Sequence, residues 1–148
     1  MKTHLITKDQ LDSENKYIGA TDITAFEGNI EIEVNLGYVV FSALKAVGYI
    51  LAKAGSGIKA GWGIEAGEGI KAGWGIEAGE GIKAGSGIKA GWGIEAGSGI
   101  EAKLRIFAGL IMWRLPNPEE LKITCKKLES GTIAFGELIE TGKAEPKI

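Results

Sequence analysis

The chain has 148 residues and a formal net charge of −2, from 17 basic and 19 acidic side chains. This length fits one compact domain or a repeat array, and the nearly balanced charge gives no overall attraction to nucleic acid or anionic membrane. The single cysteine, Cys125, and the single histidine, His4, exclude an internal disulfide framework and multi-histidine metal sites.

The N-terminal residues 1–16 are polar and lack the apolar centre, roughly 7–15 residues long, of a signal peptide. Charges such as Lys45 and Arg105 interrupt the longest apolar stretches, which therefore fall short of the roughly 18–20 residues that a membrane-spanning helix needs. We expect a cytoplasmic protein. Residues 7–10 have the pattern of a capping box before a short helix, and residues 1–22 are predicted to form an N-terminal cap.

Between residues 55 and 102 the chain repeats one hexapeptide eight times, as Gly-x-Gly-Ile-Lys/Glu-Ala. Glycine occupies 16 of these 48 positions, and each glycine destabilises a helix by roughly 0.8–1 kcal/mol relative to alanine, which excludes a helix. Collagen is excluded as well, because glycine does not recur at every third position. A fixed short period of this kind is typical of a solenoid.

Within each hexapeptide, Ile and Ala lie two positions apart with a charged residue between them, which is the alternation of a β-strand. The Gly-x-Gly that follows is expected to form a corner, where glycine can adopt positive φ. The sequence therefore predicts an all-β fold, a β-solenoid with Ile and Ala inside and Lys or Glu in solvent.

The six-residue period continues more weakly on both sides of the array, so residues 23–113 are predicted to form one continuous coil. Pro116 and Pro118 are expected to break the ladder, because proline cannot donate a backbone hydrogen bond. The alternating segments after them predict a C-terminal β-hairpin cap over residues 114–148.

The charged positions suggest how the hexapeptides stack. If three hexapeptides of one chain made a turn, the Lys and Glu positions would stack in five pairs, three of opposite charge and two of like charge. If each hexapeptide stacked on the next one in the sequence, five of seven such pairs would have opposite charges. Consecutive stacking requires three chains wound around one axis. An intertwined homotrimer is therefore the preferred hypothesis, and solubility patterning of Lys and Glu is the alternative.

The run of GIKAG and GIEAG motifs over residues 55–102 resembles uncharacterised glycine-rich GIxAG-repeat proteins of gut bacteria and their phages. That resemblance implies no activity. The period of six is also similar to the left-handed β-helix of hexapeptide acyltransferases, which coil as homotrimers. The detailed pattern differs, because here the small residue Ala60 follows the aliphatic Ile58 instead of preceding it.

Large side chains occupy several of the predicted corners. A stripe of exposed tryptophans could bind a protein partner, since Trp is enriched at interface hot spots. Alternatively, each ring covers its flanking glycines or a neighbouring rung. The candidate partner-binding residues are Trp62, Trp74, Trp92, Glu68 and Glu80.

The residues give little support for catalysis, a cofactor or a metal. The array has no aspartate for a calcium-binding turn. Lysines beside tryptophans could contact a nucleotide or a single strand, but the mixed charges do not favour nucleic acid. His4 is interpreted as an ordinary polar residue of the tail, and Cys125 as a small apolar core residue without a partner base.

We therefore expect a non-enzymatic repeat scaffold, such as a fibre or spike piece of a phage or mobile element, located in a virion or a host cytosol. The alternative is a small phage-encoded inhibitor that binds or sequesters a host defence component. Acyl transfer is a third hypothesis, which would require acyl-CoA in a groove between coils.

Overall fold

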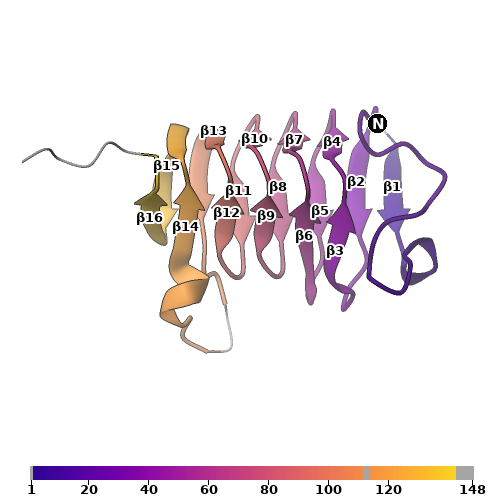
Figure 1. Cartoon of the computed structure of the whole chain (residues 1–148), viewed down its shortest axis with the longest axis horizontal. Coiled ribbons are helices and arrows are strands. Elements are labelled where there is room, and N and C mark those ends of the chain that lie inside the picture. The colour runs from indigo at the N-terminus through magenta and orange to yellow at the C-terminus, as the bar shows by residue number, and fades with distance from the viewer. Residues whose placement is uncertain (1, 112–113, 143–148) are drawn as a thin grey trace, which may run out of the picture.

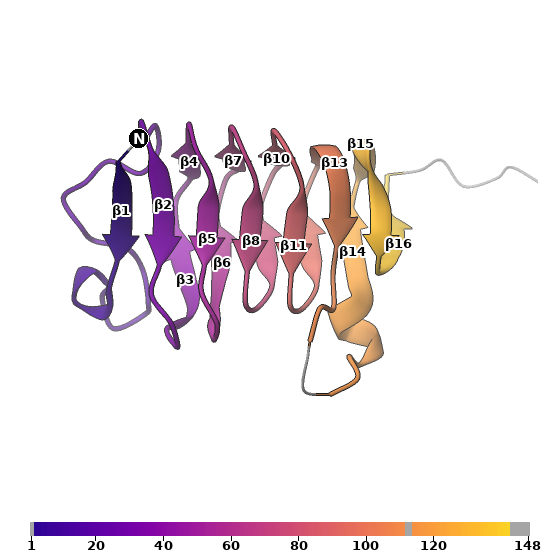
Figure 2. The same ribbon diagram turned by 180° about the vertical axis from the view of Figure 1, so that it is seen from behind.

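The computed structural model describes residues 2–111 and 114–142 and shows a β-solenoid with three faces, whose strands follow one another along the long axis (Figure 1). Face A contains β1 (Thr3–Ile6), β2 (Asn29–Ile32), β5 (Ile50–Ala52), β8 (Ile70–Ala72) and β11 (Ile88–Ala90), which lie side by side in Figure 2. Face B contains β4 (Leu44–Ala46), β7 (Ile64–Ala66) and β10 (Ile82–Ala84). Face C contains β3 (Gly37–Phe41), β6 (Ser56–Ala60), β9 (Ile76–Ala78), β12 (Ile94–Ala96), β14 (Lys122–Cys125) and β16 (Glu137–Glu140). Two longer strands, β13 (Gly99–Phe107) and β15 (Lys127–Phe135), run from face B around the corner into face A.

The chain visits the faces in the order A, C, B, and all strand pairs between successive turns are parallel. In the regular array each hexapeptide stacks on the one 18 residues away, so that Ile58 pairs with Ile76 and Ile76 with Ile94. Three consecutive hexapeptides therefore make one turn of a single chain.

This register differs from the stacking preferred on charge grounds. Neighbouring hexapeptides of the chain lie on different faces instead of on top of one another, so the intertwined stacking is not the arrangement of this chain. The two stackings differ by only a few charge pairs, each worth about 0.2–1 kcal/mol, which is too little to set the register when both build a parallel ladder over an apolar core. The homotrimer as such stays a prediction.

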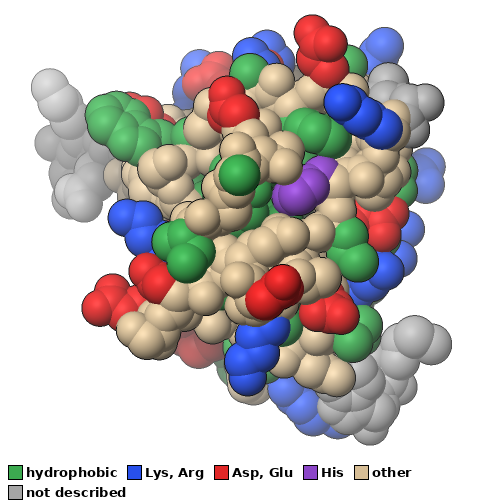
Figure 3. All heavy atoms as spheres, turned by 90° about the vertical axis from the view of Figure 1, so that its right-hand side faces the viewer, with side chains coloured by type: hydrophobic (Ala, Val, Ile, Leu, Met, Phe, Trp, Pro, Cys, Tyr) green, Lys and Arg blue, Asp and Glu red, His purple; other side chains and the backbone are tan. Residues whose placement is uncertain are grey.

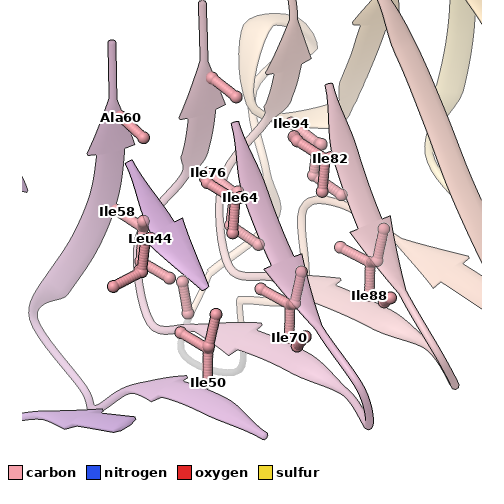
Figure 4. Packing of buried hydrophobic residues seen from close by; sticks show 14 of the residues in the cluster. Leu44, Ile50, Ile58, Ala60, Ile64, Ile70, Ile76, Ile82, Ile88 and Ile94 are labelled. Atoms are coloured by element: carbon pink, nitrogen blue, oxygen red, sulfur yellow. The ribbon is translucent and has the colours of Figure 1, made fainter. Parts of the chain in front are cut away.

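The core is a set of aliphatic columns that run along the solenoid axis (Figure 4). All eight isoleucines of the array are at most 1% exposed, and all eight alanines at most 6%. The predicted β-solenoid and its inward Ile and Ala positions are thus confirmed. Each rung is too small to bury its own apolar face, and stacking supplies the missing contacts.

The array glycines serve a different purpose from the one expected. Only Gly55 among them has positive φ, +79°. From Gly67 onward, the first glycine of each corner instead lies against a carbonyl group of the preceding turn. A Cβ added to Gly79 would lie 2.0 Å from the oxygen of Gly61, and one added to Gly85 1.9 Å from that of Gly67. Glycine is therefore needed for close backbone approach between corners.

The N-terminal segment belongs to the coil, so the predicted boundary at residue 23 is wrong. Strand β1 pairs in parallel with β2, and isolated bridges join Lys16 to Val40 on face C and Phe26 to Ala46 on face B. The short 3-10 helix η1 (Lys8–Gln10) begins after Thr7, whose side chain makes no capping hydrogen bond to the helix backbone. Viewed end-on, hydrophobic side chains are scattered among polar atoms (Figure 3).

The C-terminal segment also continues the coil, so the predicted β-hairpin is wrong. Strand β14 pairs in parallel with β12 and β16, and β15 pairs in parallel with β13. Pro116 and Pro118 lie in an insertion after Ala108, beyond which Ile123 stacks on Ile94 and the ladder resumes. Proline interrupts pairing locally here but does not end the coil. The predicted coil includes residues 112–113 and the predicted C-terminal cap includes residues 143–148, and both segments lie outside the described residues.

The insertion is held by a capped 3-10 helix and an ion pair. Asn117 and Glu120 form a reciprocal capping box at the start of η2 (Pro118–Leu121). Both oxygens of Glu120 accept hydrogen bonds of 2.7 Å from Arg114. The Arg114 hydrogen bonds, together with the backbone hydrogen bond at Asn117, lower the pKa of Glu120 to about 2. A charged carboxylate therefore anchors this loop.

Candidate functional site

The five candidate partner-binding residues lie on three different corners and do not form one stripe. Trp74 and Trp92 occupy the corner between faces A and C, and Trp62 and Glu80 the corner between faces C and B. Glu68 lies on the third corner, between faces B and A. The 18-residue turn separates them, because only residues 18 positions apart share a corner.

Trp74 and Trp92 stack on each other, with ring centroids 4.4 Å apart and planes 12° apart. Tyr38 packs against both rings, at centroid distances of 5.5 and 6.2 Å. The Tyr38 ring also lies over Gly57 and Gly75. Burial, followed by the charge of Glu77, raises the pKa of the Tyr38 hydroxyl. This aromatic cluster covers corner backbone, as the alternative interpretation expected.

Trp62 has no such cover and is 62% exposed. Backbone hydrogen bonds connect its corner to the same corner of the next two turns. The Glu80 N–H donates to the Trp62 carbonyl at 2.8 Å, and the Ser98 N–H donates to the Glu80 carbonyl at 3.1 Å. The indole therefore projects from a rigid, hydrogen-bonded edge with a carboxylate on the next rung. Trp62 is the most exposed of the three array tryptophans, since Trp74 and Trp92 are partly buried.

A groove of about 840 Å³ runs along face C beside Trp62. Lys59, Glu77 and Glu95 lie in its floor, in one outward column of register partners. Burial, and then the hydrogen bond to the neighbouring carboxyl of Glu95, raise the pKa of Glu77, while Lys59 opposes that shift. The groove thus combines an aromatic rim with charges of both signs.

A second groove, of about 760 Å³, crosses face A between Leu51 and Phe107. Among the described residues, no Asp or Glu lines it, and four cationic side chains do: Lys71, Lys89, Lys103 and Arg105. The sequence analysis did not find this site. The available signal was the replacement of the corner Gly-x-Gly by Lys-Leu-Arg at residues 103–105.

His4 and Cys125 have structural surroundings. His4 lies on β1, half-buried against Tyr17 and Phe26 at ring-centroid distances of 6.3 and 5.9 Å, and so is not part of a free tail. Cys125 is fully buried, as predicted, and burial raises the pKa of its thiol.

Within residues 2–111 and 114–142, the potential metal-ligating side chains His, Cys, Asp and Glu nowhere gather in a group of three. In the same part of the chain, no helix is long and apolar enough to span a bilayer. Comparison with protein-family models, with curated proteins and with solved structures finds no match to this chain.

Proposed function

We propose that this protein is a non-enzymatic scaffold that binds a protein partner through the Trp62 corner. The observation that carries the proposal is the exposed indole of Trp62 on a rigid edge, where the other two array tryptophans are packed. Tryptophan contributes large contact area with few rotatable bonds, which makes it a frequent interface hot spot.

The surroundings of Trp62 suit a protein partner. The face C groove next to it offers Lys59, Glu77 and Glu95 as a polar, charged surface beside the indole. An interface with a central aromatic residue and a polar, mixed-charge rim is the usual anatomy of protein–protein recognition.

The test compares Trp62→Ala with Val47→Ala, a matched loss of an exposed apolar side chain on another corner, where Val47 is 56% exposed. Partners that co-purify with the wild-type chain are identified, purified and titrated calorimetrically against each variant. We expect Trp62→Ala to weaken the reconstituted complex at least about tenfold and Val47→Ala to leave it unchanged. Equal affinities for both variants would contradict the proposal.

We also propose, from the resemblance to GIxAG-repeat proteins of gut bacteria and their phages, that the scaffold is a fibre or spike piece. The elongated coil supports this role (Figure 1). A homotrimer is then expected, and light scattering coupled to size-exclusion chromatography measures it; a monomer at all concentrations would contradict that assembly. Neighbouring genes for host take-over, in place of tail genes, would favour the inhibitor alternative.

A further inference from the structure

The face A groove is built where the repeat departs from its own rule. Position 103 continues the corner column of Gly67 and Gly85, and position 105 that of Gly69 and Gly87, yet they hold Lys and Arg. Side chains at these positions need a different corner path, and β13 passes through this corner as one uninterrupted strand. Residues 103–105 directly follow the last regular hexapeptide, and a departure from a local rule is expected at functional or strained sites.

The same groove concentrates positive charge that the fold does not neutralise. Lys71 and Lys89 are register partners on adjacent strands, which lie about 4.7–4.9 Å apart, and like charges placed in this way destabilise a sheet. None of the four lining cations takes part in an ion pair with another described residue. By contrast, Lys45 and Lys83 in the equivalent column of face B each pair with a glutamate at 3.4 Å.

Apolar and aromatic side chains also line the groove, together with the hydroxyl-bearing Ser86 and Thr132. Leu51 and Phe107 mark the two ends of its outward column, and Leu104, which is 58% exposed, forms one side. The Lys89 ammonium lies 5.3 Å from the centre of the Phe107 ring. A volume of about 760 Å³ lies within the usual range for small-molecule sites, about 300–1,000 Å³.

The nearest carboxylate in the outward column of face A is already bound. Glu31, one turn before Leu51, accepts a hydrogen bond from the Tyr49 hydroxyl and pairs with Lys53 at 3.4 Å. Its charge is therefore compensated inside the protein. Glu68 lies on the adjoining corner, next to the lining residue Gly69, so this carboxylate flanks the groove. The four lining cations still leave the groove with an excess of positive charge.

We propose that the face A groove binds a nucleoside polyphosphate. Lys71, Lys89 and Arg105 contact the phosphates, and the base lies against Phe107. Arginine presents a planar fork that matches phosphate oxygens, and an aromatic ring offers a stacking face to a base. This site lies on a different face from Trp62, so the proposal is independent of the protein-binding function.

The test is calorimetric titration of ATP, without added metal, into the wild-type chain and into Lys71→Gln/Lys89→Gln. We expect the double variant to weaken binding at least about tenfold, since charge-assisted hydrogen bonds are the strong ones, and added salt to weaken wild-type binding. Lys83→Gln changes the same repeat position on face B and serves as the control, with affinity retained within about twofold. Circular dichroism checks folding, and the two single variants replace the double variant if it fails to fold.

A second comparison separates the base from the phosphates. Phe107→Leu should lower the affinity for ATP while leaving that for inorganic triphosphate unchanged, because only the nucleotide has a ring to stack. Absence of ATP binding at millimolar concentration, or equal binding by wild type and double variant, would overturn the proposal. Binding of an oligothymidylate or a polyglutamate by a chain that does not bind ATP would also overturn the proposal and would assign the groove to that polymer.

Discussion

The two glycines of one corner should respond very differently to the same substitution. In the corner between faces C and B, a Cβ at Gly79 would lie 2.0 Å from the carbonyl oxygen of Gly61. A Cβ at Gly81 would lie 3.4 Å from the oxygen of Gly99, an ordinary van der Waals distance. Gly79→Ala and Gly81→Ala therefore add the same methyl group two residues apart, and only the first forces two turns of the coil apart.

The size of the Gly79→Ala effect follows from the hydrogen bonds at that corner. The N–H of Gly79 donates to Ala60 at 2.9 Å and that of Glu80 to Trp62 at 2.8 Å. Loss of two such bonds, with partly unsatisfied carbonyl groups left behind, destabilises the fold by about 2–4 kcal/mol. For a domain of this size that corresponds to a decrease in Tm of roughly 4–16 °C.

Thermal unfolding monitored by far-ultraviolet circular dichroism measures both variants against the wild type. Gly81→Ala should leave Tm unchanged or raise it slightly, since alanine restricts the unfolded chain and stabilises by about 0.4–1 kcal/mol where the backbone allows it. Equal Tm values for the two variants would refute the conclusion that the first corner glycine is required by contact between turns.

Two further substitutions test side chains on the surface. Trp74→Ala should reduce the free energy of unfolding, measured by urea titration, by about 1–3 kcal/mol, because it removes two aromatic contacts and uncovers backbone. Trp62→Ala should change the same free energy by no more than about 0.5 kcal/mol. A larger loss for Trp62→Ala than for Trp74→Ala would contradict the packing described for the two rings. Glu77→Gln should stabilise the fold at neutral pH by about 0.2–1 kcal/mol. The folded-state pKa of Glu77 is raised, so its ionisation opposes folding above that pKa, and the advantage of the variant should shrink as pH falls through it. Glu101→Gln is the control: it removes the 3.4 Å ion pair with Lys83 and should not stabilise the fold. A stabilisation by Glu77→Gln that does not change with pH would show that ionisation of Glu77 is not its cause.

The positions of the array tryptophans could be predicted from the sequence only in part. That Trp62, Trp74 and Trp92 occupy corners follows from their position between glycines. Which corner each occupies depends on the number of hexapeptides per turn, and this number separates Trp62 from the other two. The cationic groove could be suspected from Lys103 and Arg105, but Lys71 and Lys89 join them only because the turn is 18 residues long.

The amino-acid sequence by itself determined the β-solenoid and its inside. Alternation of Ile, a charge and Ala is a local pattern, and any strand that obeys it must turn Ile76 and its equivalents inward, where they are found. Tertiary structure alone decided which hexapeptides stack on one another, and this stacking determines which charged side chains share a face. Stacking depends on corner geometry and on contacts between residues 18 positions apart, and the charge-pair energies visible in the sequence are too small to set it. Contacts between turns also add the terminal segments to the coil, where the sequence predicted caps. Ile6 and Ile123 join the core through strands that pair with a neighbouring turn.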